Sequence, residues 1–122
     1  MPAANRLKAF RQALRADGAV VSTLVNIRYL CGFTGSNGLL WVDGKGARLF
    51  TDSRYALQAK QETAGSGASV QIVKGPLLPA LAAYLEKRPV KQFAFENQRV
   101  SFALAHGLKK LGRLVALDGV LE

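Results

Sequence analysis

The run Leu39-Leu40-Trp41-Val42 constrains the fold more than any other stretch of this 122-residue sequence. Four consecutive apolar residues suit a central strand that is covered on both faces. The tight sequence Asp43-Gly44-Lys45-Gly46 follows, and residues 47–51 then provide a second strand, so the two strands are predicted to pair as an antiparallel hairpin. A hairpin with both faces covered indicates a layered domain.

Short strands and helices alternate along the rest of the chain. Leu7, Phe10 and Leu14 share one face of a predicted helix over 3–16, which Gly18 would end. Further strands are predicted at 19–21, 69–73, 92–95 and 114–117, and further helices at 22–30, 53–63, 77–88 and 104–111. Ser22 or Thr23 is expected to cap the helix over 22–30, and Gly32 to end it. Such alternation predicts a mainly parallel sheet, and the hairpin makes it mixed. The expected fold is one three-layer α/β domain over 1–122, with about six strands flanked by helices.

Charge and cysteine content restrict the possible partners and compartments. Seventeen Lys and Arg against eight Asp and Glu give a net charge of +9, but the basic residues form no stripe, so nucleic-acid binding is not expected. No apolar run approaches the roughly 20 residues that span a bilayer.

The basic residues before Ala16 resemble a transit peptide, yet the apolar face of the predicted helix favours a folded role. The single Cys31 is expected as a buried thiol in a reducing compartment, and the predicted location is cytoplasmic.

A glycine-rich segment over 32–38 is the main candidate for ligand binding. Glycines occur at every third position, and Thr34, Ser36 and Asn37 lie between them. Glycine permits close approach to the backbone, and polar groups on a loop between apolar elements suit ligand contact. The alternative is a solvent-exposed turn without a partner.

Two arginines and an aspartate flank this segment. Arg28 and Arg54 each offer a planar fork of donors to a carboxylate, although an ordinary surface arginine, or an ion pair with Asp52, explains either one equally simply. Asp52 is predicted to cap the helix over 53–63. Tyr29, Phe33 and Tyr55 are interpreted as core or loop-packing aromatics, and Asn26 as a partner of local backbone groups.

Catalytic motifs are missing from the sequence. There is no phosphate-binding Walker pattern, no dinucleotide fingerprint and no Gly-x-Ser-x-Gly elbow, and one histidine, His106, cannot form a typical zinc set. Glu96 and Asp118 both end predicted strands, and with Asp52 they would form a carboxylate metal site if the strand order allowed it. No catalytic residue and no metal ligand is otherwise predicted.

Three segments resemble motifs of a known family. Residues 26–37 resemble the Asn-x-x-Tyr-Leu-[Thr/Ser]-Gly-Phe-x-Gly-Ser segment of creatinase-type N-terminal domains, found in Xaa-Pro aminopeptidases and prolidases. Residues 51–59 are similar to the family's Thr-Asp-Gly/Ser-Arg-Tyr…Gln-Ala, and residues 93–96 to its Ile-Gly-[Phe/Val]-Glu strand end. The matched structural positions are Asn26, Tyr29, Gly32, Asp52 and Tyr55.

The resemblance implies a mixed six-stranded domain that precedes a catalytic domain of pita-bread fold. In the family, that later domain binds two divalent metal ions, commonly manganese, cobalt or zinc, and hydrolyses the peptide bond before proline. Those metal ligands lie beyond this sequence, so the chain alone is expected to hydrolyse nothing. Its expected partners are its own C-terminal catalytic domain, a second copy in a homodimer and a proline-containing peptide.

In creatinase, the loop that matches Thr34 to Asn37 contacts substrate in the neighbouring subunit, so the resemblance implies a substrate-proximal loop here. That loop comprises Phe33, Thr34, Gly35, Ser36 and Asn37. Ser36 stands where creatinase has arginine, which disfavours a creatine-type amidinohydrolase. The alternative from another class is a stand-alone ribonuclease-H-like module that binds nucleic acid or an acidic protein through its positive charge.

Overall fold

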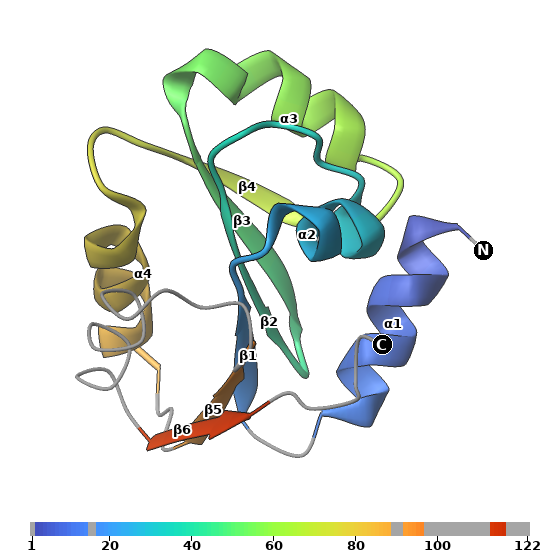
Figure 1. Ribbon diagram of the computed structural model, residues 1–122, viewed down its shortest axis with the longest axis vertical. Coiled ribbons are helices and arrows are strands. Elements are labelled where there is room, and N and C mark those ends of the chain that lie inside the picture. The colour runs from blue at the N-terminus through green and yellow to red at the C-terminus, as the bar shows by residue number, and fades with distance from the viewer. Residues whose placement is uncertain (1, 15–16, 89–91, 97–112, 117–122) are drawn as a thin grey trace.

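The computed structural model describes residues 2–14, 17–88, 92–96 and 113–116, and its strands form one mixed sheet (Figure 1). The six strands of this part of the chain are β1 (Gly18–Val21), β2 (Leu39–Asp43), β3 (Gly46–Asp52), β4 (Ser69–Val73), β5 (Gln92–Phe95) and β6 (Arg113–Ala116). Their order across the sheet is β4-β3-β2-β1-β5-β6. Strand β2 pairs antiparallel with both neighbours, and the other pairs are parallel. The predicted mixed sheet and its central hairpin are confirmed.

These directions give the sheet two different edges. Strands β1, β3, β4, β5 and β6 all end at one edge, called here the carboxyl edge, and β2 begins there. The turn between β2 and β3 lies at the opposite end, called here the hairpin edge. Because α2 follows β1 and the 32–38 segment leads into β2, that segment lies at the carboxyl edge.

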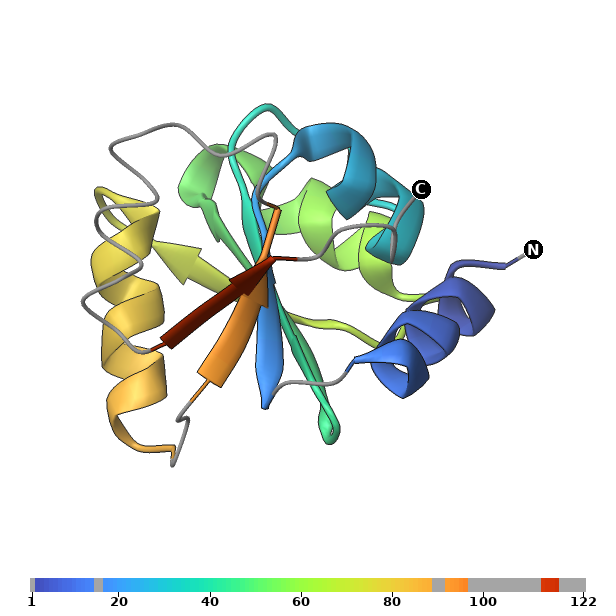
Figure 2. The same ribbon diagram turned by 60° about the horizontal axis from the view of Figure 1, so that its bottom comes forward.

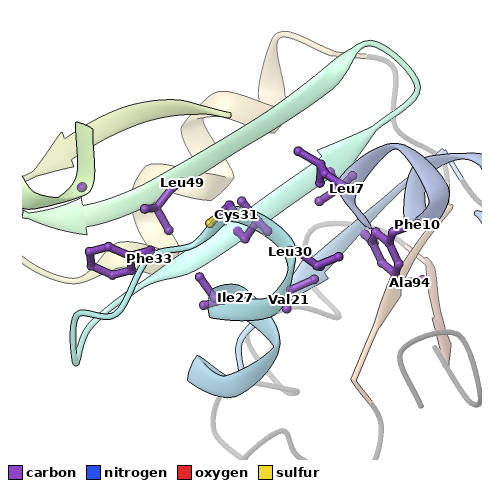
Figure 3. Close-up of a cluster of buried hydrophobic side chains, with 13 residues drawn as sticks. Leu7, Phe10, Val21, Ile27, Leu30, Cys31, Phe33, Leu49 and Ala94 are labelled. Atoms are coloured by element: carbon purple, nitrogen blue, oxygen red, sulfur yellow. The ribbon is translucent and has the colours of Figure 1, made fainter. Parts of the chain in front are cut away.

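Helices cover both faces of the sheet, as a three-layer domain requires (Figures 1 and 2). The helices are α1 (Ala3–Ala13), α2 (Leu24–Cys31), the 3-10 turn η1 (Ser53–Tyr55), α3 (Ala56–Thr63) and α4 (Leu77–Glu86). Helices α1, α2 and α3 bury one apolar cluster against the sheet, and part of it is drawn in Figure 3. Helix α4 packs on the other face through Leu77, Leu81 and Leu85. No helix in the described part of the chain is long and apolar enough to cross a membrane.

The alternation of side chains along β2 explains why its whole run is apolar. Leu40 and Val42 join the cluster beneath α1 and α2, whereas Leu39 and Trp41 join the cluster beneath α4. Successive residues of a strand point to opposite faces, so a strand between two helical layers needs an apolar residue at every position. The prediction of a doubly covered central strand is confirmed.

Several predicted boundaries are wrong. Helix α1 ends at Ala13, and Gly18 lies inside β1 instead of ending the helix. A Cβ atom at Gly18 would lie 2.2 Å from the Trp41 ring, so this glycine makes room for tryptophan on the neighbouring strand. The helix predicted over 53–63 divides into η1 and α3, and β6 begins at Arg113. The helix predicted over 104–111 lies outside the described residues.

Candidate functional site

The segment 32–38 connects α2 to β2 across the carboxyl edge. Gly32 ends α2 in the left-handed conformation, with φ of 88°, and its N–H donates to the Arg28 carbonyl at 2.8 Å. A Cβ atom at Gly32 would lie 2.7 Å from the carbonyl oxygen of Glu62, so the end of α2 abuts α3. The predicted role of Gly32 in ending the helix is confirmed.

The next glycine serves packing within the domain. Phe33 is 1% exposed, and its ring lies under the segment, where a Cβ at Gly35 would come within 2.2 Å of Phe33 Cζ (Figure 3). Gly35 is itself buried. The close approach that the sequence suggested for a ligand is therefore taken by the Phe33 ring. Phe33 supports the segment from below, and its ring meets Tyr55 edge to face at 5.5 Å.

Glu62 of α3 holds the first half of the segment. Its carboxylate accepts hydrogen bonds from Thr34 N at 2.9 Å and Thr34 Oγ1 at 2.6 Å. Gln58 donates to both Thr34 Oγ1 and Glu62 Oε1. Loss of solvent around Glu62 would raise its pKa, but the hydrogen bonds from Thr34 and Gln58 outweigh that effect and the pKa is lowered. The exposed Thr34 is thus fixed in position.

Tyr55 holds the second half. Its phenol oxygen lies 2.6 Å from Ser36 Oγ and accepts from Ser36 N at 3.2 Å. The hydrogen bonds with Ser36 lower the pKa of Tyr55. Together with its contact with Phe33, this confirms Tyr55 as an aromatic that packs the loop.

Asp52, the last residue of β3, links the end of the segment to η1 through hydrogen bonds. Its carboxylate accepts from Arg54 N at 3.0 Å, which confirms the predicted cap, and from Asn37 Nδ2 at 2.8 Å. The Arg54 guanidinium donates two further bonds to it at 2.9 Å. The bonds from Arg54, and then that from Asn37, hold the pKa of Asp52 well below its usual range. Of the three interpretations left open for Arg54, which were a carboxylate-binding group, an ordinary surface arginine and an ion pair with Asp52, the ion pair is the one observed.

A hollow of about 280 Å³ lies between α2 and the exposed side of the segment, and we call it the α2 hollow. Its lining comprises Leu24, Val25, Arg28, Phe33, Thr34, Gly35 and Ser36. Arg28 contributes the cationic group, while Leu24 and Val25 are 41% and 69% exposed. Among the predicted candidates, Arg28, Thr34 and Ser36 therefore come together here. Asn37 and Arg54 do not line this hollow and bind Asp52 instead.

Tyr29 corrects one sequence-based interpretation. Its side chain is 49% exposed, so it is not a core aromatic, and the Arg6 guanidinium lies 4.9 Å from its ring centre. Helix α2 turns Ile27, Leu30 and Cys31 into the core. A helix advances 100° per residue, so positions between those three face solvent. Tyr29 extends the exposed apolar surface beside the α2 hollow.

The cap of α2 comes from a distant strand. Glu96, directly after β5 and 6% exposed, accepts from Ser22 N at 2.6 Å, from Thr23 N at 2.8 Å and from Asn26 Nδ2. The Thr23 side chain makes no capping bond, so the prediction of a local Ser or Thr cap is wrong. Asn26 likewise binds this carboxylate and not local backbone. Sequence reasoning missed the arrangement because 70 residues separate Asn26 from Glu96, and no local pattern joins them.

The suggested carboxylate metal site is not supported by the residues described. Asp52 and Glu96 share the carboxyl edge, but β2 and β1 lie between their strands, which places the strands roughly 14 Å apart. Each carboxylate already accepts several hydrogen bonds, and no three potential ligands gather within the described ranges. Asp118 and His106 lie outside them. Burial raises the pKa of the Cys31 thiol to about 11, which suits the predicted buried thiol and not a nucleophile.

Comparison with known proteins gives a consistent result. The profile of the Creatinase/Prolidase N-terminal domain matches residues 4–122. The uncharacterized peptidase YqhT of Bacillus subtilis (strain 168) is 34% identical over 100 residues, which are 80% of this chain and 27% of YqhT.

Solved structures show the same fold. The N-terminal domain of the cytoplasmic peptidase PepQ from Mycobacterium tuberculosis H37Rv is 31% identical, with a TM-score of 0.81 over 98% of this chain and 95% of that one. An Xaa-Pro dipeptidase from Bacillus anthracis, 22% identical, shares the fold with a TM-score of 0.86 over 98% of this chain and 35% of its own. The chain therefore spans about a third or less of YqhT and of that dipeptidase.

Proposed function

Because the chain belongs to the creatinase/prolidase N-terminal domain family, we propose that it is the non-catalytic N-terminal domain of a metal-dependent peptidase that cleaves at Xaa-Pro bonds. The match over residues 4–122 carries this proposal. The absence of a gathered ligand set or an activated nucleophile within the described residues is compatible with it. Two divalent ions, manganese, cobalt or zinc, would be held by a separate catalytic domain and would supply the nucleophilic hydroxide there.

The α2 hollow is the surface that we assign to the substrate pocket. Leu24 and Val25 offer apolar contact for a side chain such as the proline ring, and Arg28 offers a planar pair of donors to a carboxylate. Thr34 and Ser36 are fixed by Glu62 and Tyr55, so the wall is formed before substrate arrives. A rigid wall raises the reaction rate by positioning substrate, without taking part in bond cleavage.

The proposal also includes the partners. The catalytic domain would meet the carboxyl edge, where the α2 hollow opens, and a homodimer would allow the domain of one subunit to complete the pocket of the other. The cytoplasm is the proposed location, since PepQ is described as a cytoplasmic peptidase.

A chimera tests the proposal. Residues 4–122 replace the matching segment of the Xaa-Pro dipeptidase from Bacillus anthracis, and hydrolysis of an Xaa-Pro dipeptide is followed with manganese present. We expect the isolated chain to be inactive and the chimera to be active. Arg28→Gln in the chimera should raise KM roughly tenfold, the loss expected for one charge-assisted hydrogen bond.

The matched control is Lys60→Gln, which removes the same charge from the exposed side of α3. It should leave both kcat and KM within twofold of the values for the unsubstituted chimera. Turnover by the pure isolated chain would contradict the non-catalytic assignment. Unchanged kinetics for Arg28→Gln in an active chimera would refute the proposal that the α2 hollow forms part of the substrate pocket.

A further inference from the structure

A second hollow lies at the hairpin edge, on the face covered by α4 and at the opposite end of the sheet from the α2 hollow. It measures about 280 Å³, and we call it the hairpin hollow. Lys45 from the β2–β3 turn, Ser69 from β4, and Tyr84 and Arg88 from the end of α4 contribute to its lining. Three segments that are distant in sequence therefore meet there.

Cationic groups converge on one aromatic ring in this hollow. The guanidinium carbon of Arg88 lies 3.5 Å from the Tyr84 ring centre, and that of Arg48 lies 4.7 Å from the same centre. The ring attracts each cation, so two positive charges lie beside one ring. Lys45 and Arg88 are the cationic residues of the lining, and Arg48 lies beside the Tyr84 ring without lining the hollow.

Hydrogen-bonding capacity also remains unused. Arg48 Nε is shielded from solvent and has no hydrogen-bond partner in the described part of the chain, while its Nη1 donates to Gln71 at 3.2 Å. Arg88 uses Nη1 to donate to the Tyr84 carbonyl at 3.1 Å. The shielded Arg48 Nε is out of reach of a ligand in the hollow, whereas the exposed Arg88 side chain has further N–H groups that can donate to one.

The chain supplies no carboxylate for these cations among the residues described. Asp43 lines the hollow, but its Oδ1 accepts from Lys45 N and Gly46 N, and its Oδ2 accepts from Trp41 Nε1. No ion pair within the described ranges involves Lys45, Arg48 or Arg88. Over residues 89–112 the only acid is Glu96, which already caps α2 at the other edge.

We propose that the hairpin hollow is a binding site for a small phosphate compound, with Lys45 and Arg88 as its cationic contacts and Arg48 as a further positive charge beside the Tyr84 ring. A phosphate group carries up to two charges and several acceptor oxygens, so it can serve more than one of these cations at once, and guanidinium groups bind it in a bidentate manner. A single carboxylate would neutralise only one. The site lies away from the α2 hollow and does not depend on the proposed peptidase role.

Calorimetric titration of the whole 122-residue chain with inorganic pyrophosphate at low ionic strength tests this assignment. We expect saturable binding at one site, and backbone NMR shifts centred on residues 45–48 and 84–88. Arg88→Gln and Lys45→Gln should each weaken binding roughly tenfold. Lys60→Gln, with the same loss of charge on the α1–α3 face, should change it less than twofold.

Three results would overturn the assignment: no saturable binding, equal weakening by Lys60→Gln and Lys45→Gln, or tighter binding of a pentaglutamate peptide than of pyrophosphate. The last would assign the surface to an acidic protein partner. Thermal melts check that each variant folds, which is expected because the Lys45 and Arg88 side chains are both exposed.

Discussion

Charged side chains at the two edges of the sheet differ in whether they have hydrogen-bonding or ionic partners within the described residues. At the carboxyl edge, Asp52, Glu62 and Glu96 each accept hydrogen bonds from two or more groups and thereby hold α2 and the 32–38 segment in place. At the hairpin edge, Arg48 and Arg88 share the Tyr84 ring with no carboxylate beside them in the described residues.

This difference separates charges that stabilise the fold from charges that remain available. A buried carboxylate that receives backbone donors contributes to stability, and removing it leaves those donors unsatisfied. An exposed cation with no carboxylate beside it in the described residues, such as Arg88, contributes little to stability but can still bind a ligand. Substitutions at the carboxyl edge should therefore affect unfolding, whereas matched substitutions at the hairpin edge should not.

The largest effect is expected from Gly35→Val. The Cβ of the introduced valine would overlap the Phe33 ring, which is buried in the core and has little room to move. Overpacking should therefore lower the free energy of unfolding by roughly 3 kcal/mol. At Gly44, in the hairpin turn, no atom lies within 4 Å of an added Cβ. Gly44→Ala should therefore change the free energy of unfolding by less than about 0.5 kcal/mol. Urea denaturation measures both. Equal stability of the two variants would contradict the difference between the edges.

A smaller loss is expected from Glu96→Ala. Removing this carboxylate leaves Ser22 N, Thr23 N and Asn26 without their acceptor, which should cost about 2 kcal/mol. Hydrogen exchange should also accelerate in the first turn of α2. The exposed Glu86 at the end of α4 provides the control, and Glu86→Ala should leave both measurements nearly unchanged. Unaltered exchange in α2 would show that the cap is not needed.

The smallest effect concerns pH and Asp52, whose side chain is 19% exposed. Its pKa is lowered by folding, so its contribution to stability is complete above the ordinary aspartate pKa near 4 and is lost as the pH falls from there toward the folded-state pKa. The difference in unfolding free energy between wild type and Asp52→Asn should therefore be constant from about pH 5 to 7 and shrink below about pH 4. A difference that does not vary with pH would refute the role of the charged carboxylate.

The sequence by itself determined the features whose causes lie within a few residues of one another. The apolar run of β2 and the glycine turn after it predict the hairpin, Gly32 ends α2 because its conformation is left-handed, and Asp52 caps the turn directly after it. Each depends on backbone conformation or on hydrogen bonds between near neighbours. The motifs of 26–37 and 51–59 were likewise sufficient to identify the family, which the profile match confirms.

Only the tertiary structure decided which distant residues meet. The order of the strands brings Glu96 to the start of α2, and it separates Glu96 from Asp52. The packing of Phe33 under Gly35 and of Trp41 against Gly18 gives those glycines a role that local sequence does not reveal. Local periodicity says which face of an element is buried, but the partner it is buried against depends on how all the layers pack together. For that reason the loop was predictable as a feature, while its supports and the cationic hollow at the other edge were not.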